Sequence, residues 1–308
     1  MPLLSDKHLA YIGMILVTSI VGLSFIFVKV GLEYANPIDL LAHRFSVGAI
    51  TVGVLWIFGL LKFTPFSWAK TKTLLLLSLF FPLLFFAFQA YGMEYSSASE
   101  AGIIFSAVPI VTLIVAGIFL KEKTNTLQKN GIALTILGIA YIMYRTGNIS
   151  ENTSFKGVVL LFLSVLSVVT YYALGKKMST KIPVLEITVW MTLLSFIVFN
   201  SWSLIIHLQN NSLNTFLEPL AHKEFIWTVV YLGVLSSVLT SFLTNYALSK
   251  IPASQIAVFN NLSPIIAIIG GVVILKETLH SYQIIGGILV IAGIVLAQIS
   301  KSDKEKLN

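Results

Sequence analysis

The sequence predicts an all-α integral membrane protein whose ten transmembrane helices form two inverted five-helix repeats. The first observation is composition, because 56% of the 308 residues are hydrophobic and only 11% are charged, whereas soluble domains carry about 25% charged residues. The second is a series of apolar stretches, each close to the roughly 20 residues that a membrane helix needs. The third is an internal repeat.

The repeat relates residues 98–142 to residues 253–297. A shift of 155 positions aligns the two segments without a gap, and 14 of the 45 positions are identical. The identities include one proline, one glutamate, one glutamine and two glycines per copy, namely Pro109 and Pro264, Glu122 and Glu277, Gln128 and Gln283, Gly131 and Gly286, and Gly138 and Gly293. Apolar composition alone would not align these residue types, so the sequence indicates a duplicated membrane unit.

Ten apolar segments can be placed in order along the chain. They are His8–Gly31, Leu40–Leu61, Thr73–Tyr91, Ala98–Leu120, Leu127–Tyr144, Phe155–Leu174, Val184–Ile206, Phe225–Leu248, Ala253–Leu275 and Tyr282–Ile299. Five of them fall in each repeat, which predicts a first unit over residues 1–147, a second over 148–300 and a polar cytoplasmic tail over 301–308. The longest connection, from about His207 to Glu224, contains "QNNSLNTFLEP" and is expected to be a surface loop.

The positive charges predict the orientation of the helices. With the N-terminus inside, 14 of the 20 Lys and Arg residues fall in the inside tracts and 6 in the outside tracts. Positive residues concentrate on the cytoplasmic side, so we expect a multi-pass cell-membrane protein with both termini cytoplasmic. Five helices per copy is an odd number, so the second copy runs in the opposite sense to the first. Inverted repeats are typical of carriers that hold substrate near the midplane.

Several sequence features resemble one known family. A helix with a central proline ends in "FLKEK" in one copy and "ILKET" in the other, and a Gly-rich helix follows each. Together with the opening "GLSFIFVKVGLEYANPIDLLAHRFSVGA", this order resembles the EamA unit of the drug/metabolite transporter superfamily. The resemblance covers nearly the whole chain. It implies a ten-helix transporter of small metabolites, often an exporter, whose members handle amino acids, other metabolites and drugs.

The residues also argue against other classes of protein. There is no Cys, and no P-loop, H-E-x-x-H or G-x-S-x-G pattern, so we expect no ATP hydrolysis, enzyme activity, metal or cofactor. The net charge of +7 is assigned to topology rather than to nucleic-acid binding. The leading interpretation is a secondary transporter that moves amino acids or similar amphipathic solutes by alternating access. The alternative is a non-transporting scaffold or a lipid-translocating partner subunit.

The repeated helices suggest a central binding pocket. Pro109 and Pro264 are expected near the middle of their helices, where each frees a carbonyl group and acts as a hinge, as a pocket wall or only as a packing kink. Asn260 and Asn261 lie one turn before Pro264, and Ser106 matches Asn261 in the first copy. These three polar residues are expected either to line the pocket or to bond neighbouring helices. Further substrate-binding candidates are Ser24, Phe25, Asn245 and Tyr246.

Three cationic residues lie close to the outer boundary of the first copy, namely Lys29, His43 and Arg44. One interpretation is an ion-paired outer rim, in which Glu33 and Asp39 neutralise them and the side chains snorkel. The other is an anion site in which Arg44 donates two hydrogen bonds to a carboxylate. His43 is also the candidate for proton coupling, since an imidazole titrates near neutral pH.

Glu122 and Glu277 are expected to have a structural role. Each follows the end of a helix and precedes a plausible N-cap, Thr126 or Ser281. The carboxylate would accept hydrogen bonds from the backbone N–H groups at the start of that next helix. The glycines of the fifth and tenth helices are seven residues apart in each copy and therefore share a face. Small residues allow close helix packing, so we expect these two helices to form a packing interface or a homodimer interface rather than the transport pathway.

Overall fold

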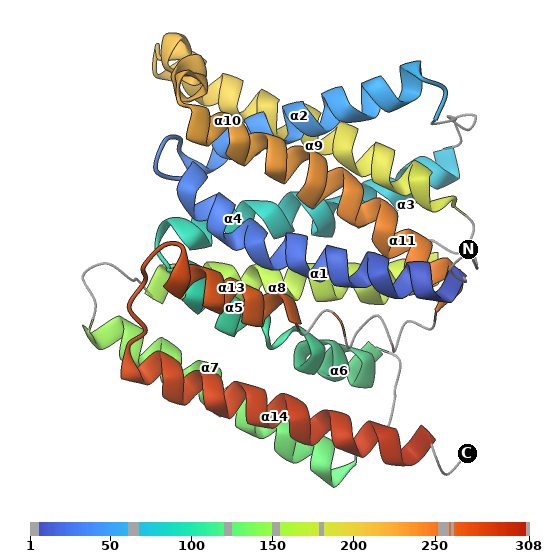
Figure 1. Ribbon diagram of the computed structural model, residues 1–308, viewed down its shortest axis with the longest axis vertical. Helices are drawn as coiled ribbons and strands as arrows, with labels where there is room; N and C mark the ends of the chain where they lie inside the picture. Colours follow the sequence, from blue (N-terminus) through green and yellow to red (C-terminus); the bar gives the residue numbers. More distant parts are fainter. Residues whose placement is uncertain are drawn as a thin grey trace, which may run out of the picture.

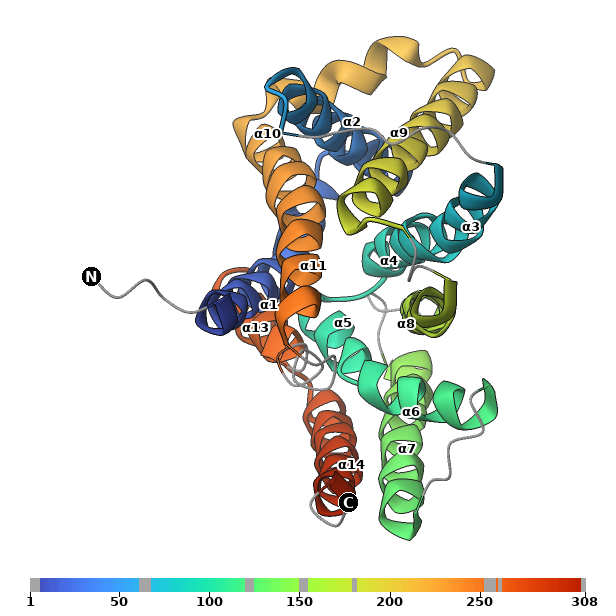
Figure 2. The same cartoon turned by 90° about the vertical axis from the view of Figure 1, so that its right-hand side faces the viewer.

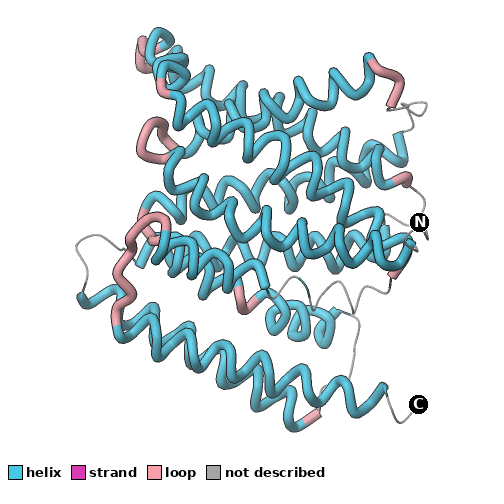
Figure 3. The backbone as a smooth tube through the Cα atoms, in the orientation of Figure 1, coloured by secondary structure: helices cyan, strands magenta, loops and turns pink. Residues whose placement is uncertain are grey.

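A computed structural model describes residues 6–60, 68–119, 125–149, 155–178, 182–251, 259 and 262–305. All regular structure in these ranges is helical (Figure 3). The elements are α1 (Asp6–Gly31), α2 (Pro37–Ile57), α3 (Trp68–Ser78), η1 (Leu79–Leu84), α4 (Phe85–Glu94), α5 (Ala98–Phe105), α6 (Val108–Phe119), α7 (Thr126–Ile149), α8 (Phe155–Met178), α9 (Val184–Gln209), η2 (Leu213–Ala221), α10 (Lys223–Val230), η3 (Tyr231–Leu239), α11 (Thr240–Lys250), α13 (Leu262–Val273) and α14 (Ser281–Glu305).

Seven described segments are long and apolar enough to cross a membrane, and α13 and the apolar part of α14 are shorter apolar helices. Large hydrophobic side chains on the outer helices face outward, such as Leu137 at 61% exposure and Ile288 at 61%. Exposed apolar surface of this kind suits contact with lipid. The chain is therefore a helical membrane protein.

The long helices lie side by side, with α7 and α14 at one end of the long axis and α2 and α9 at the other (Figures 1 and 2). α1 begins and α14 ends at the same end of the bundle (Figure 1). At this end the Lys250 ammonium group donates to the Asp6 carboxylate at 2.7 Å. This hydrogen bond raises the pKa of Lys250, so its ammonium group stays charged in the physiological range.

Local capping explains where several helices begin. The Asn36 side chain accepts from the backbone N–H groups of Ile38 and Asp39, and Pro37 occupies the first position of α2, where proline costs no hydrogen bond. At α7 the Gln128 side chain accepts from the Asn125 N–H at 3.0 Å. The equivalent bond at α14 runs from the His280 N–H to Gln283 at 2.9 Å. Thr126 and Ser281 are therefore the first residues of their helices. The N-cap positions are Asn125 and His280, one residue earlier than expected.

Pro109 does not lie in the middle of a continuous helix. The predicted helix Ala98–Leu120 is two helices, α5 and α6, separated by a turn at Ser106 and Ala107. Pro109 is the second residue of α6, and Pro264 is the third residue of α13. A proline in the first turn of a helix has no N–H partner to lose, so Pro109 begins a half-helix rather than kinking a long one. The chain just before α13 lies outside the described residues, so the predicted mid-helix position of Pro264 stays a prediction.

The third and eighth predicted helices also depart from regular α-helix. η1 and η3 have π-helical geometry, and the backbone of Phe81 is non-helical at φ −139° and ψ 120°. The shift of 155 positions that relates the repeats carries residues 79–84 onto 234–239, which lie within η3. π-Helical turns inside α-helices are frequent at functional sites. Both segments face the same cavity, described below.

The Gly-rich helices α7 and α14 pack against each other within one chain. A Cβ atom at Gly131 would lie 2.5 Å from the Gly293 carbonyl oxygen, and one at Gly138 would lie 2.8 Å from that of Gly286. Only residues without a side chain allow such an approach. The expected packing interface is therefore present and joins the two helices of one chain, while a homodimer remains a prediction.

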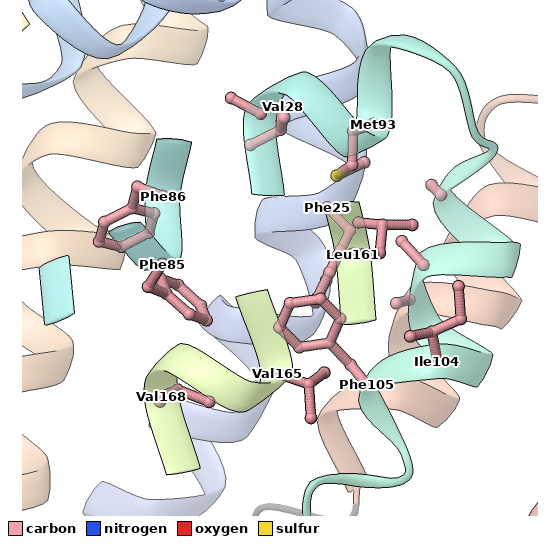
Figure 4. Close-up of a cluster of buried hydrophobic side chains, with 14 of the residues drawn as sticks. Phe25, Val28, Phe85, Phe86, Met93, Ile104, Phe105, Leu161, Val165 and Val168 are labelled. Carbon is pink, nitrogen blue, oxygen red and sulfur yellow. The ribbon is translucent and has the colours of Figure 1, made fainter. Parts of the chain in front are cut away.

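Aromatic and aliphatic side chains fill the centre of the bundle. Phe25 of α1 meets Phe105 of α5 edge to face, with ring centroids 5.0 Å apart, beside Leu161 and Val165 of α8 (Figure 4). The Ser24 hydroxyl is buried and donates to the Val21 carbonyl at 2.6 Å. Ser24 and Phe25 are thus core residues at the junction of three helices.

Candidate binding site

Arg44 of α2 lies inside the bundle, and only 1% of the residue is exposed. Its Nε atom donates to the Ser237 hydroxyl at 3.1 Å and its Nη2 atom to the Ser236 hydroxyl at 3.3 Å. The guanidinium carbon lies 3.9 Å from the centroid of the Phe86 ring, within the range of a cation–π interaction. In the described part of the chain no carboxylate lies within 4.0 Å of Arg44. The outer-rim interpretation is therefore wrong for Arg44.

A cavity of about 70 Å³ lies among the partners of Arg44, and we name it the Arg44 cavity. Ser236 and Ser237 belong to its wall and hold the guanidinium group. The lining combines hydroxyl groups with aromatic and aliphatic groups, and comprises Phe45, Phe81, Pro82, Phe86, Tyr171, Ile187, Thr188, Met191, Thr192, Ser236, Ser237, Thr240 and Ser241. These residues come from α2, η1, α4, α8, α9, η3 and α11. Both predicted repeats thus contribute to one site.

Hydrogen bonds to the backbone hold several of the hydroxyl groups. Ser237 donates to the Leu232 carbonyl at 2.9 Å, Thr240 to the Ser236 carbonyl at 2.8 Å, and Thr192 to the Thr188 carbonyl at 2.8 Å. A hydroxyl that donates its proton to the backbone still has lone pairs with which to accept. The three groups therefore present acceptors to the cavity side of their helices, and Ser237 uses one for Arg44.

The sequence held a signal for this hydroxyl face that composition alone does not show. Ser236 and Ser237 form one adjacent pair and Thr240 and Ser241 another, four positions further along a largely apolar helix. Residues three and four apart share a helix face. That spacing could have pointed to a polar stripe directed at the interior, whereas the pairing of the stripe with Arg44 required the fold.

Asp39 pairs with His207 rather than with the cations expected. Its carboxylate accepts from His207 Nε2 at 2.9 Å, from Asn36 Nδ2 at 2.6 Å and from the Ser203 hydroxyl. The other ring nitrogen of His207 contacts the Ser212 hydroxyl at 2.8 Å. This buried cluster joins α2 and α9 at the end of the bundle opposite the start of α1. The expected surface loop therefore contains a buried histidine and the 3₁₀ helix η2.

His43 and Arg44 face different parts of the molecule. Adjacent helix positions are about 100° apart, and His43 Nε2 contacts the Phe216 carbonyl of η2 at 2.9 Å while its ring stacks on Phe216. His43 therefore holds the 3₁₀ segment and does not line the Arg44 cavity. The Lys29 ammonium donates to the carbonyls of Met93 and Ser96 at 2.9 and 2.8 Å. Lys29 thus satisfies the end of α4, where the dipole favours a cation.

Ser106 and Pro264 do lie together, but in an apolar setting. They line a second cavity of about 180 Å³ whose other walls are Ile103, Ile265, Ile268, Gly287, Ile291, Ile294 and Val295. The Ser106 hydroxyl donates to the Ile103 carbonyl at 2.6 Å. Pro109 lines neither cavity. Asn260, Asn261 and the side chain of Asn245 lie outside the described parts, and Tyr246 packs against the cluster of Ala10, Met14, Val17, Ala247 and Ile251.

Glu277 caps a helix of the other repeat. Its carboxylate accepts from the backbone N–H groups of Ala98 and Ser99 at 2.7 and 2.9 Å, and from the Ser99 hydroxyl at 2.6 Å. A carboxylate at a helix N-terminus is favourable. The expected structural role is present, but the helix that is capped is α5 and not the following helix α14. Glu122 lies outside the described residues.

The sequence and fold have clear relatives. The EamA-like transporter family model matches residues 8–144 and 155–298. The uncharacterized transporter YcxC of Bacillus subtilis (strain 168) is 40% identical over 297 residues, which are 96% of this chain and 95% of the relative. A probable amino-acid metabolite efflux pump of Salmonella typhimurium is 24% identical over 290 residues, or 92% of each chain.

One crystal structure covers 98% of this chain and 99% of its own, with a TM-score of 0.58 and 14% identity. At that identity the likeness concerns the fold alone. The family match extends through both halves of the sequence and agrees with the relative at 40% identity. The chain therefore belongs to the EamA-like transporter family and is a membrane transporter.

Proposed function

We propose that the chain is a secondary carrier of small organic solutes that bear a carboxylate, such as amino acids or similar amphipathic metabolites. The solute binds in the Arg44 cavity, with its carboxylate on the guanidinium group. The observation that carries the proposal is the burial of Arg44 without a carboxylate partner among the described residues. It deepens the anion-site interpretation of the sequence.

The energetic cost of burying Arg44 supports this assignment. A buried charge costs several kcal/mol unless it is paired and fully hydrogen-bonded. Two serine hydroxyls and the Phe86 ring offset part of this cost, but they bring no negative charge. Arginine suits planar, bidentate recognition of a carboxylate. A bound carboxylate would supply the missing charge and hydrogen-bond acceptors.

Ten transmembrane helices in two inverted repeats, over residues 1–147 and 148–300, are the proposed architecture. Three pairs of features related by the 155-residue shift support it: the Gln128 and Gln283 caps, the glycines of α7 and α14, and the π-helical segments η1 and η3. α7, α13 and α14 would provide the crossings beyond the seven long apolar segments. The common end of α1 and α14 fits an even number of crossings, and the positive charges favour cytoplasmic termini.

Alternating access is the proposed mechanism. η1 and η3 are π-helical segments of the third and eighth helices beside the Arg44 cavity, at positions related by the repeat, and η1 is broken at Phe81. Discontinuous helices at the binding site are typical of carriers built from inverted repeats. Small rotations at η1 and η3 would open the cavity to one side of the membrane and then to the other.

Export of amino acids or related metabolites is proposed by analogy with the Salmonella protein named as a probable amino-acid metabolite efflux pump. The competing proposal is a scaffold or a lipid-translocating partner subunit that transports no solute by itself. The buried cation favours the carrier, since a scaffold has no need for an unneutralised charge in its interior.

Transport by the purified chain alone tests this proposal. Proteoliposomes loaded with unlabelled metabolites would be offered labelled carboxylate solutes one at a time, with the wild type, Arg44→Gln and Lys223→Gln. Lys223 is the matched control because its side chain is 84% exposed. Accumulation by the wild type and the control but not by Arg44→Gln is expected. Equal accumulation by all three would remove Arg44 from the site, and no accumulation by any would favour the scaffold.

A further inference from the structure

We infer that the Arg44 cavity selects small 2-hydroxy monocarboxylates over the zwitterionic amino acids of the same carbon skeleton. The inference rests on the proposed function and narrows its substrate class. It follows from the charge, the hydrogen-bonding groups and the volume of the cavity.

The charge of the cavity matches a single carboxylate. No Lys, Arg, Asp or Glu is among the described residues that line the cavity, and Arg44 lies behind its wall, bonded to the lining residues Ser236 and Ser237. The acid next in sequence to the lining is Glu186, before Ile187, and Lys70 lies 3.7 Å from its carboxylate. A bound ammonium group would therefore lack a negative partner, and a dicarboxylate would leave one charge unpaired. Unpaired buried charges are strongly unfavourable.

The hydrogen-bonding groups match a hydroxyl better than an ammonium. The hydroxyls of Thr192 and Thr240 donate their protons to backbone carbonyls, so they can offer only acceptors to a solute. An alcohol O–H needs one acceptor and carries no charge. An ammonium has three donors to satisfy as well as a charge. A 2-oxo acid, which has no donor, would leave these acceptors unused.

The volume of the cavity matches a small solute. Its volume of about 70 Å³ is well below the ~300–1,000 Å³ of ordinary ligand pockets. A carboxylate with a short carbon chain is close to this size, and Phe86, Phe45 and Met191 provide apolar walls for the chain. Longer side chains require the cavity to widen. A three-carbon skeleton is therefore the appropriate probe.

The test compares lactate, pyruvate, alanine and alaninamide on the full-length wild type. Binding is measured by calorimetric titration of the purified protein, and transport by exchange in proteoliposomes. We expect lactate to bind and exchange at least ~10-fold better than alanine, as the loss of one charged hydrogen-bond match implies. The affinity and exchange rate of pyruvate should fall between those of lactate and alanine. The cationic alaninamide should neither bind nor exchange. Alanine equal to or better than lactate in binding would overturn the inference.

A pair of variants tests the hydroxyl acceptors directly. Thr192→Val and Thr240→Val remove an acceptor with little change of shape, so the preference for lactate over pyruvate should shrink while pyruvate binding persists. An unchanged preference in both variants would contradict the role given to these hydroxyls. Selective lactate binding without exchange would refute the proposed carrier function and leave the inferred selectivity standing. Exchange that prefers alanine would support the carrier function and refute the inferred selectivity. Neither binding nor exchange of any probe would refute both.

Discussion

The buried charge of Arg44 is expected to serve solute binding at the expense of the stability of the fold. Its guanidinium group is buried at 1% exposure against two serines and Phe86. Replacing a buried ionic group by a hydrophobic residue of similar volume is often neutral or stabilises a protein by about 1–4 kcal/mol. The residue is therefore expected to be retained for binding and not for folding.

Arg44→Met should raise the melting temperature of the empty protein and abolish transport, because it removes the buried charge together with the carboxylate partner. Arg44→Lys should keep partial activity with a KM raised about tenfold, since an ammonium cannot form the bidentate pair. Melting curves in detergent and exchange rates in proteoliposomes check both effects. A lower melting temperature with full transport in Arg44→Met would contradict this account.

In contrast to Arg44, the Asp39–His207 pair is expected to stabilise the fold. Asp39→Asn places an N–H donor where the carboxylate accepts from His207, Asn36 and Ser203, so the protein should lose about 2 kcal/mol of stability. Glu224→Gln is the control, because that carboxylate is 47% exposed and lies 4.0 Å from Lys223. Equal melting temperatures for the two variants would argue against the buried network.

Sequence reasoning identified Arg44 but not its surroundings. The choice between an outer rim and an interior anion site depends on where the side chain points, and the sequence alone does not fix that direction. The polar residues that follow His207 predict a surface loop there, whereas its ring is buried against Asp39, 168 positions away. Contacts between residues so distant in sequence leave no local signal.

At the scale of the element, close packing of α7 on α14 depends on glycine. Gly131→Ala should destabilise the protein, because the new Cβ would lie 2.5 Å from the Gly293 carbonyl and 2.9 Å from the Ala297 Cβ and N atoms. Gly53→Ala in α2 is the control, since nothing lies within 4 Å of its added Cβ and alanine favours a helix by up to about 1 kcal/mol. Melting temperatures should fall for the first variant and hold or rise for the second.

The elements themselves were largely predictable. Each of the ten apolar segments contains helix, and the described residues within them that are not helical are 58–60, 106–107 and 274–275. Apolar length is a strong signal in a membrane protein. The departures from regular α-helix within them were not predicted. η1 and η3 are π-helical segments, and the turn at Ser106 splits one segment into α5 and α6. Hydropathy does not distinguish a straight helix from two half-helices of equal length.

At the scale of the whole molecule, the proposed topology can be tested by labelling. The chain contains no Cys, so single cysteines can be introduced without removing others. In right-side-out vesicles, Leu213→Cys at the start of η2 should react with an impermeant reagent added outside. Asp303→Cys near the end of α14 should react only after the vesicles are made permeable. Reaction of both from the same side would contradict ten crossings with cytoplasmic termini.

The charge of the empty carrier predicts its mode of transport. Without solute, Arg44 must pass through the conformational change as an unpaired buried cation, whereas a bound carboxylate neutralises it. Exchange should therefore exceed net efflux by about tenfold or more, which requires a barrier difference of only about 1.4 kcal/mol. The comparison is efflux from loaded proteoliposomes into solute-free buffer and into buffer with solute. Equal rates would contradict a penalty for the empty state.

The central claim is that Arg44 binds the carboxylate of the solute. The most direct measurement is the affinity of lactate and of its neutral amide, lactamide, for the wild type and for Arg44→Gln, since the four values isolate the coupling between this side chain and the carboxylate. The account predicts that the wild type prefers lactate at least ~10-fold and that the preference disappears in Arg44→Gln. The same preference in both proteins would contradict it.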